Sequence, residues 1–253
     1  MTKRVTKNLV DFTPKDVANK FAEFKDASDV LENHGAILGT MVALCYKQGG
    51  EKLVAEYFNY NYLDSGAMYR AITLYLIRSK ISFDNEDLIK HELKNIIITF
   101  KYLDGYQNTF LNNENVEKDI RGDEISNNVS KYSSISLIRE HLVSIQKEMG
   151  KRKKIVIEGR DITTVVFPDA EIKIFMTADI NVRAKRRFED MKRNNPEITY
   201  SDVLENLSER DSKDSNRKDS PLRIANDAIV IDTSDLEINE QAQKIIDIIK
   251  NKF

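Results

Sequence analysis

The stretch Ile155-Val156-Ile157-Glu158-Gly159-Arg160-Asp161 decides the fold. Three consecutive apolar β-branched residues predict a strand buried on both faces, because a half-exposed strand alternates apolar and polar positions. A glycine, a cation and a carboxylate follow at once. Ligands bind at the carboxyl ends of strands in open α/β sheets. The stretch therefore predicts a parallel sheet with a polar site at this strand end, although a turn carrying a surface ion pair would have the same composition.

Two further apolar runs predict strands of the same sheet, at 172–176 and 228–232. The spacing of apolar residues predicts helices in the remaining segments, at 14–33, 51–60, 67–79, 134–150, 179–193, 200–213 and 238–250. Alternating strands and helices are typical of a doubly wound α/β sheet. We interpret Asp64-Ser65-Gly66 as a turn between two helices, whose side chains face a ligand.

The pattern changes between residues 96 and 116. Short apolar runs at 96–100 and 107–111 are separated by Asp104-Gly105, and Asn112-Asn113 follows the second run. Short strands joined by such turn residues predict antiparallel pairing. We therefore expect a small antiparallel β insertion in a parallel sheet flanked by helices.

Charge and composition limit the functions that this chain can have. Among its 253 residues, 39 Lys and Arg balance 41 Asp and Glu, so the net charge of −2 gives no overall attraction to nucleic acid or to an anionic membrane. The single cysteine, Cys45, cannot form an internal disulfide, and no apolar run approaches the ~18 residues of a membrane helix. Three scattered histidines suggest no metal site. We expect a cytoplasmic protein.

Two charged segments follow the central strand. Arg210, Lys213, Asp214 and Arg217 share one side of a predicted helix, which suits either a salt-bridged surface or a group of cations that closes over a phosphate. The basic run at 183–193 is interrupted by two acids and lacks an aromatic platform. We expect that run to be solvated and not to bind nucleic acid.

Three segments in this order resemble the bacterial cytidylate kinase family: Leu63-Asp64-Ser65-Gly66-Ala67-Met68-Tyr69-Arg70, the run from Gly159-Arg160-Asp161 to Pro168-Asp169-Ala170, and Glu209-Arg210-Asp211 through Arg217. The resemblance extends from about Val54 to the C-terminus, and Thr163 stands where the family usually has glycine. It implies a P-loop nucleoside monophosphate kinase fold and ATP-dependent phosphorylation of CMP or dCMP, with Mg²⁺ as cofactor, by a monomer. A relative of shikimate or adenylate kinase fits these segments less well.

The resemblance also implies roles for individual residues. Ser65, Arg139 and Asp161 would read the cytosine edge, and Arg70, Arg160 and Arg217 would hold the acceptor phosphate. Asp214 and Arg210 would meet the ribose, with Ser130 nearby. Arg210 and Arg217 would also act in catalysis.

The N-terminal region departs from the family. The family has a phosphate loop, Gly-x-x-x-x-Gly-Lys-Gly-Thr, and family spacing aligns its lysine with Lys47, but Met41, Tyr46, Gln48 and Gly49 occupy its glycine and threonine positions. An altered reading frame or a decayed gene would each give this result. We therefore expect an atypical region at 1–50 and a kinase-like domain at 51–253, with a monophosphate-binding insertion at about 92–130 and a lid at about 209–221. The alternative function is a CMP-binding relative that has lost its ATP site.

Overall fold

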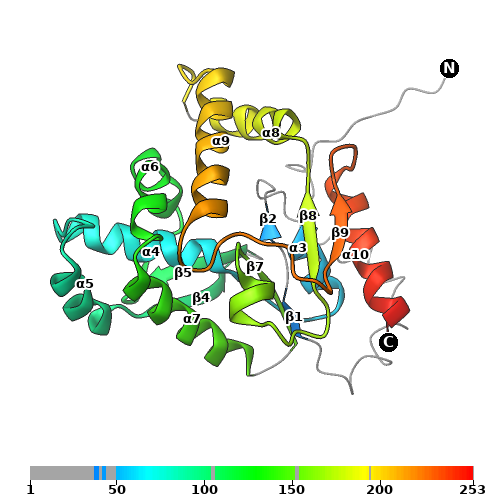
Figure 1. Cartoon of the computed structure of the whole chain (residues 1–253), viewed down its shortest axis with the longest axis horizontal. Helices are drawn as coiled ribbons and strands as arrows, with labels where there is room; N and C mark the ends of the chain where they lie inside the picture. The colour runs from blue at the N-terminus through cyan, green and yellow to red at the C-terminus, as the bar shows by residue number, and fades with distance from the viewer. Residues whose placement is uncertain are drawn as a thin grey trace.

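The computed structural model describes residues 37–39, 42–43, 50–103, 106–151, 154–193 and 195–252. Two three-stranded parallel sheets form its centre (Figure 1). In the first, β7 (Ile155–Glu158) lies between β1 (Ile37–Gly39) and β3 (Asn61–Asp64). In the second, β8 (Ile174–Thr177) lies between β2 (Val42–Ala43) and β9 (Ile229–Asp232). The two sheets share an apolar core, since Val156 of β7 packs in the same cluster as Ile174 and Met176 of β8.

Strand β7 is buried on both faces, as its sequence predicts. Ile155 and Ile157 belong to one apolar core, which contains helices α4 (Ser65–Arg78) and α7 (Ser136–Gly150). Val156 belongs to a second core, which contains α3 (Gly50–Tyr57) and α10 (Ile238–Lys252). Each fully buried Val or Ile side chain contributes about 1.5–3 kcal/mol to folding. The predicted parallel sheet flanked by helices is confirmed.

The antiparallel insertion is also confirmed. Strand β4 (Ile98–Leu103) pairs with β5 (Tyr106–Leu111), which pairs with β6 (Glu114–Asn115). Asn112 and Asn113 have φ angles of 47° and 72°, a left-handed turn that asparagine tolerates. Residues 104 and 105, where a turn was expected, lie outside the described residues. The insertion also carries α5 (Glu86–Glu92), the 3₁₀ turns η3 (Leu93–Asn95) and η4 (Asp119–Arg121), and α6 (Asp123–Tyr132).

Helices α8 (Ile180–Lys192) and α9 (Tyr200–Asn216) pack on each other around Ala184, Val203 and Leu207. Figure 1 shows α9 rising beside the sheet, with α8 at its upper end. Helix α9 begins with a capping box, in which the Thr199 side chain and Asp202 bond reciprocally to backbone amides. The capping box defines the first residue of α9, and thereby the position of the charged residues near the C-terminus of the helix.

The interpretation of Asp64-Ser65-Gly66 as a turn between helices was wrong. Residues 61–64 form strand β3, and α4 begins at Ser65 without an intervening turn. The Asp64 carboxylate caps the helix by accepting a bond from the Ala67 amide at 2.9 Å. This strand-to-helix junction lies at the carboxyl edge of the sheet, beside the end of β7, because Asp64 and Glu158 are partners in register.

Thr163 lies in a π-helical turn, η5 (Ile162–Val166), and is buried. It is not among the described non-glycine residues with positive φ angles. The turn therefore does not require the glycine that the family usually has at this position. The predicted helix at 14–33 lies outside the described residues.

Candidate functional site

A cavity of about 810 Å³ opens at the carboxyl edge of the sheet. Its walls come from the start of α4, the end of β7, the insertion around η4 and α6, and the helices α8 and α9. Eight residues that the sequence analysis assigned to the site line it: Ser65, Arg70, Arg139, Arg160, Asp161, Arg210, Asp214 and Arg217. Segments separated by up to about 150 positions in the chain thus meet at one cavity.

One end of the cavity contains a buried polar pair. Arg139 of α7 forms an ion pair with Asp161, and both residues are less than 5% exposed. Arg139 also donates to the Ser133 carbonyl oxygen at 3.0 Å, which fixes its guanidinium group. Ser65 donates to the Glu158 carbonyl oxygen at 2.6 Å. This end therefore presents a hydroxyl, a guanidinium and a carboxylate held in fixed positions.

A group of arginines forms another part of the cavity wall, and most of its members lie around Asp214. Asp214, 6% exposed, lies 3.1 Å from Arg160 Nη1, 3.3 Å from Arg217 Nη1 and 3.9 Å from Arg210 Nε. Burial lowers the pKa of Arg210 to about 9, helped by repulsion from Arg160 and Arg70 and opposed by Asp214. Asp211 also lies 3.6 Å from Arg160 Nη1, but it pairs with Arg183 as well. Two carboxylates do not offset these four arginines, so the cluster is suited to an anion.

Arg217 lines the same part of the cavity wall. Its Nε atom donates to the Ser220 carbonyl oxygen at 2.6 Å, which holds the chain beyond α9 in a tight turn with a Ser220 φ of 50°. Burial and the nearby Arg139 lower the Arg217 pKa. The buried Nη2 atom has no hydrogen-bond partner among the described residues. A donor of this kind is available to a ligand in the cavity.

Lys213, which was placed on the same side of the helix as Arg210 and Arg217, faces solvent instead. Its side chain is 64% exposed and pairs with Glu209 at 3.0 Å. The difference follows from helix geometry, because residues three apart on a helix are about 60° away from alignment and only part of the helix surface faces the cavity.

Ser130 is not brought to the cavity. It lies on α6, and its carbonyl oxygen accepts a bond from the Ser133 hydroxyl at 3.2 Å. Ser126 and Ser133 line the cavity instead, and Arg70 donates to Ser126 Oγ at 3.1 Å. Lys47, which would act in catalysis as the phosphate-loop lysine that reaches the transferred group, lies outside the described residues, so this role remains a prediction.

The sequence analysis missed several residues of the cavity wall: Glu51, Tyr69, Arg121 and Arg187. Arg187 belongs to the basic run that we expected to be solvated, and that expectation was wrong for part of the run. Arg183 and Arg187 are 5% and 8% exposed, and Arg183 Nη1 lies 2.7 Å from Asp211. Their four-residue spacing was the available signal, since it places both on one face of α8.

Arg121 links the insertion to the sheet. It donates to the Asp64 carboxylate at 2.8 Å and to Glu117 at 2.9 Å. Burial alone would lower its pKa, but the two carboxylates outweigh that effect and raise it. The guanidinium therefore stays charged at the cavity wall and fastens the insertion to the strand end.

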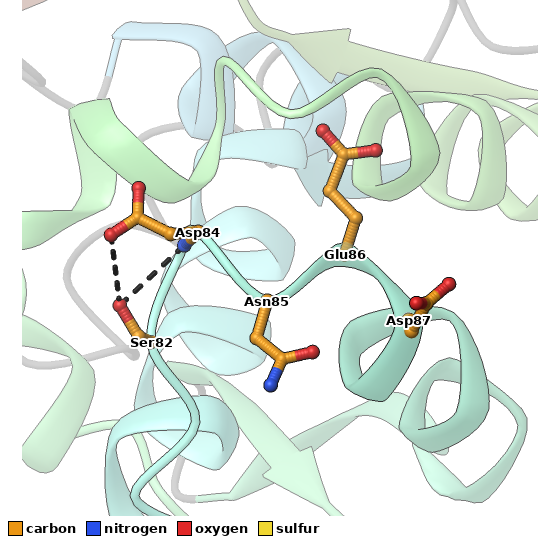
Figure 2. Close-up of a pocket in the computed structure, with 5 residues that line it drawn as sticks. All are labelled: Ser82, Asp84, Asn85, Glu86 and Asp87. Atoms are coloured by element: carbon orange, nitrogen blue, oxygen red, sulfur yellow. Dashed lines mark hydrogen bonds between the residues drawn. The ribbon is translucent and has the colours of Figure 1, made fainter.

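A second hollow, of about 560 Å³, lies at the start of α5 and has a different character. Figure 2 shows that Ser82, Asp84, Asn85, Glu86 and Asp87 line it. Its hydrogen bonds are local, from Ser82 Oγ to Asp84 and from the Leu88 amide to Asn85, which caps the helix. Three carboxylates and no cation would repel a phosphate, so the arginine-lined cavity is the better candidate.

Membrane-spanning helices and clusters of metal-binding side chains are both absent from the described residues. None of the helices in that part of the chain combines the length and apolar character needed to cross a membrane. Over the same residues, no group of three or more His, Cys, Asp or Glu side chains is arranged to hold a metal ion.

Comparisons with known proteins agree with the geometry of the cavity. Residues 47–251 match the family model for cytidylate kinase. A cytidylate kinase of Flavobacterium psychrophilum is 47% identical over 206 residues, which cover 79% of this chain and 91% of the relative. A cytidylate kinase of Parabacteroides distasonis is 47% identical over 196 residues, which cover 75% of this chain and 85% of the relative. A bifunctional pantoate ligase/cytidylate kinase of Prochlorococcus marinus is 47% identical over 204 residues, which cover 80% of this chain and 40% of the relative. The chain therefore belongs to the bacterial cytidylate kinase family.

Proposed function

We propose that the protein transfers the γ-phosphoryl group of ATP to CMP or dCMP, giving CDP or dCDP. The observation that carries this proposal is the arginine cluster around Asp214, where burial and repulsion from neighbouring arginines lower the pKa of Arg210 to about 9. Arg210 stays charged at neutral pH, and a nucleotide phosphate would offset both the repulsion between the arginines and the cost of burying this charge. The family membership of the chain supports the same reaction.

The buried pair of Arg139 and Asp161 suits a cytosine base. Asp161 can accept a hydrogen bond from the exocyclic amine, whereas the corresponding carbonyl of uracil would face a carboxylate with no proton between them. Arg139 and Ser65 would complete the set of groups that face the base. Because the ion pair with Arg139 holds Asp161 in place, recognition requires little reorganisation.

The transfer itself would depend on the arginine cluster. An oxygen of the CMP phosphate attacks the γ-phosphorus of ATP, and the bond from that phosphorus to the β,γ-bridging oxygen breaks, leaving ADP. Arg70, Arg160 and Arg217 would hold the acceptor phosphate, and Arg210 would meet the ribose. Arginine suits these roles because its planar fork bonds phosphate oxygens in pairs. Their positive charge would also stabilise charge that develops on the transferred group.

Mg²⁺ would accompany ATP and reduce the charge of its phosphates. The described residues contain no cluster of three or more His, Cys, Asp or Glu side chains that could hold a metal ion, and we assign Mg²⁺ no protein ligand. We further propose that the enzyme acts as a monomer in the cytoplasm, where Cys45 would stay reduced. A lid at about 209–221 and an insertion at about 92–130 remain our assignments for the parts that close over the nucleotides.

Titration calorimetry with CMP, dCMP, UMP and AMP tests the acceptor assignment. We expect CMP and dCMP to bind more tightly than UMP and AMP. The Asp161→Asn variant gives a more specific test, because the amide keeps the shape of the carboxylate but can donate a hydrogen bond to the uracil carbonyl. This substitution should shift the preference from CMP toward UMP. Equal affinities for CMP and UMP in the unaltered chain would refute the base-reading assignment.

A CMP-binding protein without phosphoryl transfer is the second candidate. The observation that favours it is the region before α3, where Tyr46 and Gln48 replace glycines that let backbone amides approach phosphates. In addition, Glu51 brings a carboxylate, 3% exposed, to the cavity wall in the first turn of α3. A coupled assay with ATP, Mg²⁺ and CMP separates the candidates, because only the kinase would produce ADP.

A further inference from the structure

Tyr69 lies on α4, one residue before Arg70, and lines the cavity. Its ring lies against the guanidinium group of Arg139, whose Cζ atom is 5.4 Å from the ring centroid. Arg139 in turn forms the buried ion pair with Asp161. Tyr69 therefore belongs to the end of the cavity that presents Ser65, Arg139 and Asp161.

The Tyr69 hydroxyl is buried, and it has no hydrogen-bond partner among the described residues. Buried hydroxyls in native proteins are nearly always hydrogen-bonded, so an unpaired hydroxyl in a cavity wall indicates a partner that arrives with a ligand. Burial, with a further contribution from Asp161, raises the Tyr69 pKa to about 12, although Arg139 and Arg217 oppose the shift. The hydroxyl thus keeps its proton at neutral pH and requires an acceptor.

We propose that Tyr69 is a further substrate-binding residue, whose hydroxyl donates a hydrogen bond to an acceptor atom of the pyrimidine base. This inference rests on the proposed function, since it assigns one more contact in the same acceptor site. Cytosine carries two acceptors on its ring edge, the 2-carbonyl oxygen and N3, so it can accept from the Tyr69 hydroxyl as well as from Arg139 while its amine donates to Asp161. The ring of Tyr69 would at the same time hold the Arg139 guanidinium in place by a cation–π contact.

Another tyrosine on the same helix supplies a matched control. The Tyr75 hydroxyl donates to the Glu92 carboxylate at 2.7 Å, and Tyr75 does not line the cavity. Tyr69→Phe and Tyr75→Phe each remove one oxygen and keep the ring. Because a single neutral hydrogen bond is lost, Tyr69→Phe should weaken CMP binding about three- to tenfold, measured by titration calorimetry. Tyr75→Phe should leave CMP affinity unchanged.

Thermal unfolding separates a ligand contact from a structural one. The Tyr69 hydroxyl has no partner in the free protein, so Tyr69→Phe should leave the Tm of the free protein unchanged or raise it slightly. A fall in Tm that accompanies the loss of affinity would overturn the proposal by showing a structural role.

Cytidine, which lacks the phosphate, distinguishes a base contact from a phosphate contact. Tyr69→Phe should weaken the binding of cytidine, measured by ligand-observed NMR, by the same factor as it weakens the binding of CMP. If CMP weakens while cytidine is unaffected, the contact is with phosphate and the proposal is wrong. Unchanged CMP affinity in Tyr69→Phe, with normal binding by the unaltered chain, overturns this inference alone. Failure of the unaltered chain to bind CMP overturns the proposed function as well.

Discussion

Gly159 illustrates how one residue connects the fold to the site. A Cβ atom at this position would lie 2.1 Å from Ser65 Oγ and 2.8 Å from Ile162 Cγ1. The absence of a side chain lets the end of β7 approach the start of α4, so that Ser65 can donate to the Glu158 carbonyl oxygen. Glycine is required here for close approach of two elements rather than for an unusual φ angle.

Gly159→Ala should both destabilise the protein and weaken CMP binding. The added methyl group must displace Ser65 and Ile162, and overpacking of this kind costs about 1–3 kcal/mol of unfolding free energy. Urea denaturation and CMP titration measure the two effects. Gly50→Ala is the control, because a Cβ atom there meets its nearest neighbours at an ordinary 3.6 Å. Equal stability of the two variants would contradict the predicted clash.

At the scale of the element, helix α9 has one face toward the cavity and one toward water. Arg210 lines the cavity with 24% of its side chain exposed, whereas Lys213 is 64% exposed. Arg210→Ala should weaken CMP binding about ten- to a hundredfold, because a contact to a charged group is worth about 1.5–3 kcal/mol. Lys213→Ala should leave binding unchanged, as measured by calorimetry.

The thermal stability of Arg210→Ala without CMP gives a second test of its role. Burial and neighbouring arginines disfavour the charged form of Arg210 in the free protein, so its removal should keep or raise the Tm without CMP. Loss of affinity without loss of stability is the expected signature of a ligand-binding cation. If Arg210→Ala unfolds at a lower temperature and binds CMP normally, the cluster serves the fold and not the ligand.

Helix α7 carries a histidine that should make stability depend on pH. Burial lowers the His141 pKa, and its buried Nε2 atom has no hydrogen-bond partner among the described residues. The unfolded chain therefore binds more protons than the folded one as pH falls below about 6.5, and the unfolding free energy falls with it.

Urea denaturation at pH 7.5 and at pH 5 should show a smaller loss of stability in His141→Gln than in the unaltered chain. His91→Gln is the control, because the His91 side chain is 67% exposed. A loss in His141→Gln as large as that in the unaltered chain would show that other groups cause the pH dependence.

At the scale of the whole molecule, the cavity that we propose as the acceptor site is combined with an N-terminal sequence that departs from the family's phosphate loop. We predict that the chain is a poor kinase, because each lost amide contact to a charged phosphate oxygen removes about 1.5–3 kcal/mol of binding. Several such losses would lower the rate by orders of magnitude. Rebuilding residues 41–49 as a glycine-rich phosphate loop should therefore raise turnover strongly in a coupled assay. The control is CMP affinity, which should not change. Equal turnover by both proteins would show that the natural segment binds ATP.

The sequence by itself determined the strands that are buried on both faces and the helices between them. The apolar runs at 155–157 and 172–176 form buried strands, as predicted. The run at 228–232 also forms a strand, but the expectation of burial was wrong there, because Ile229 and Val230 are exposed. Strand β3 was missed because only Tyr62 and Leu63 among its four residues are apolar. Helix α6 was also missed, although its buried Ile125, Val129 and Tyr132 are spaced by four and three residues, which is a readable helical signal.

Only the tertiary structure decided which charged residues share the cavity. Sequence spacing did not separate Arg210 from Lys213, because both lie near one another on one helix and have the same sign of charge. Burial of a cation depends on which surfaces meet when distant segments pack together. The Tyr69 hydroxyl gave no sequence signal for the same reason. Whether this hydroxyl has a hydrogen-bond partner depends on the groups around it, and Arg139, Asp161 and Arg217 come from three separate parts of the chain.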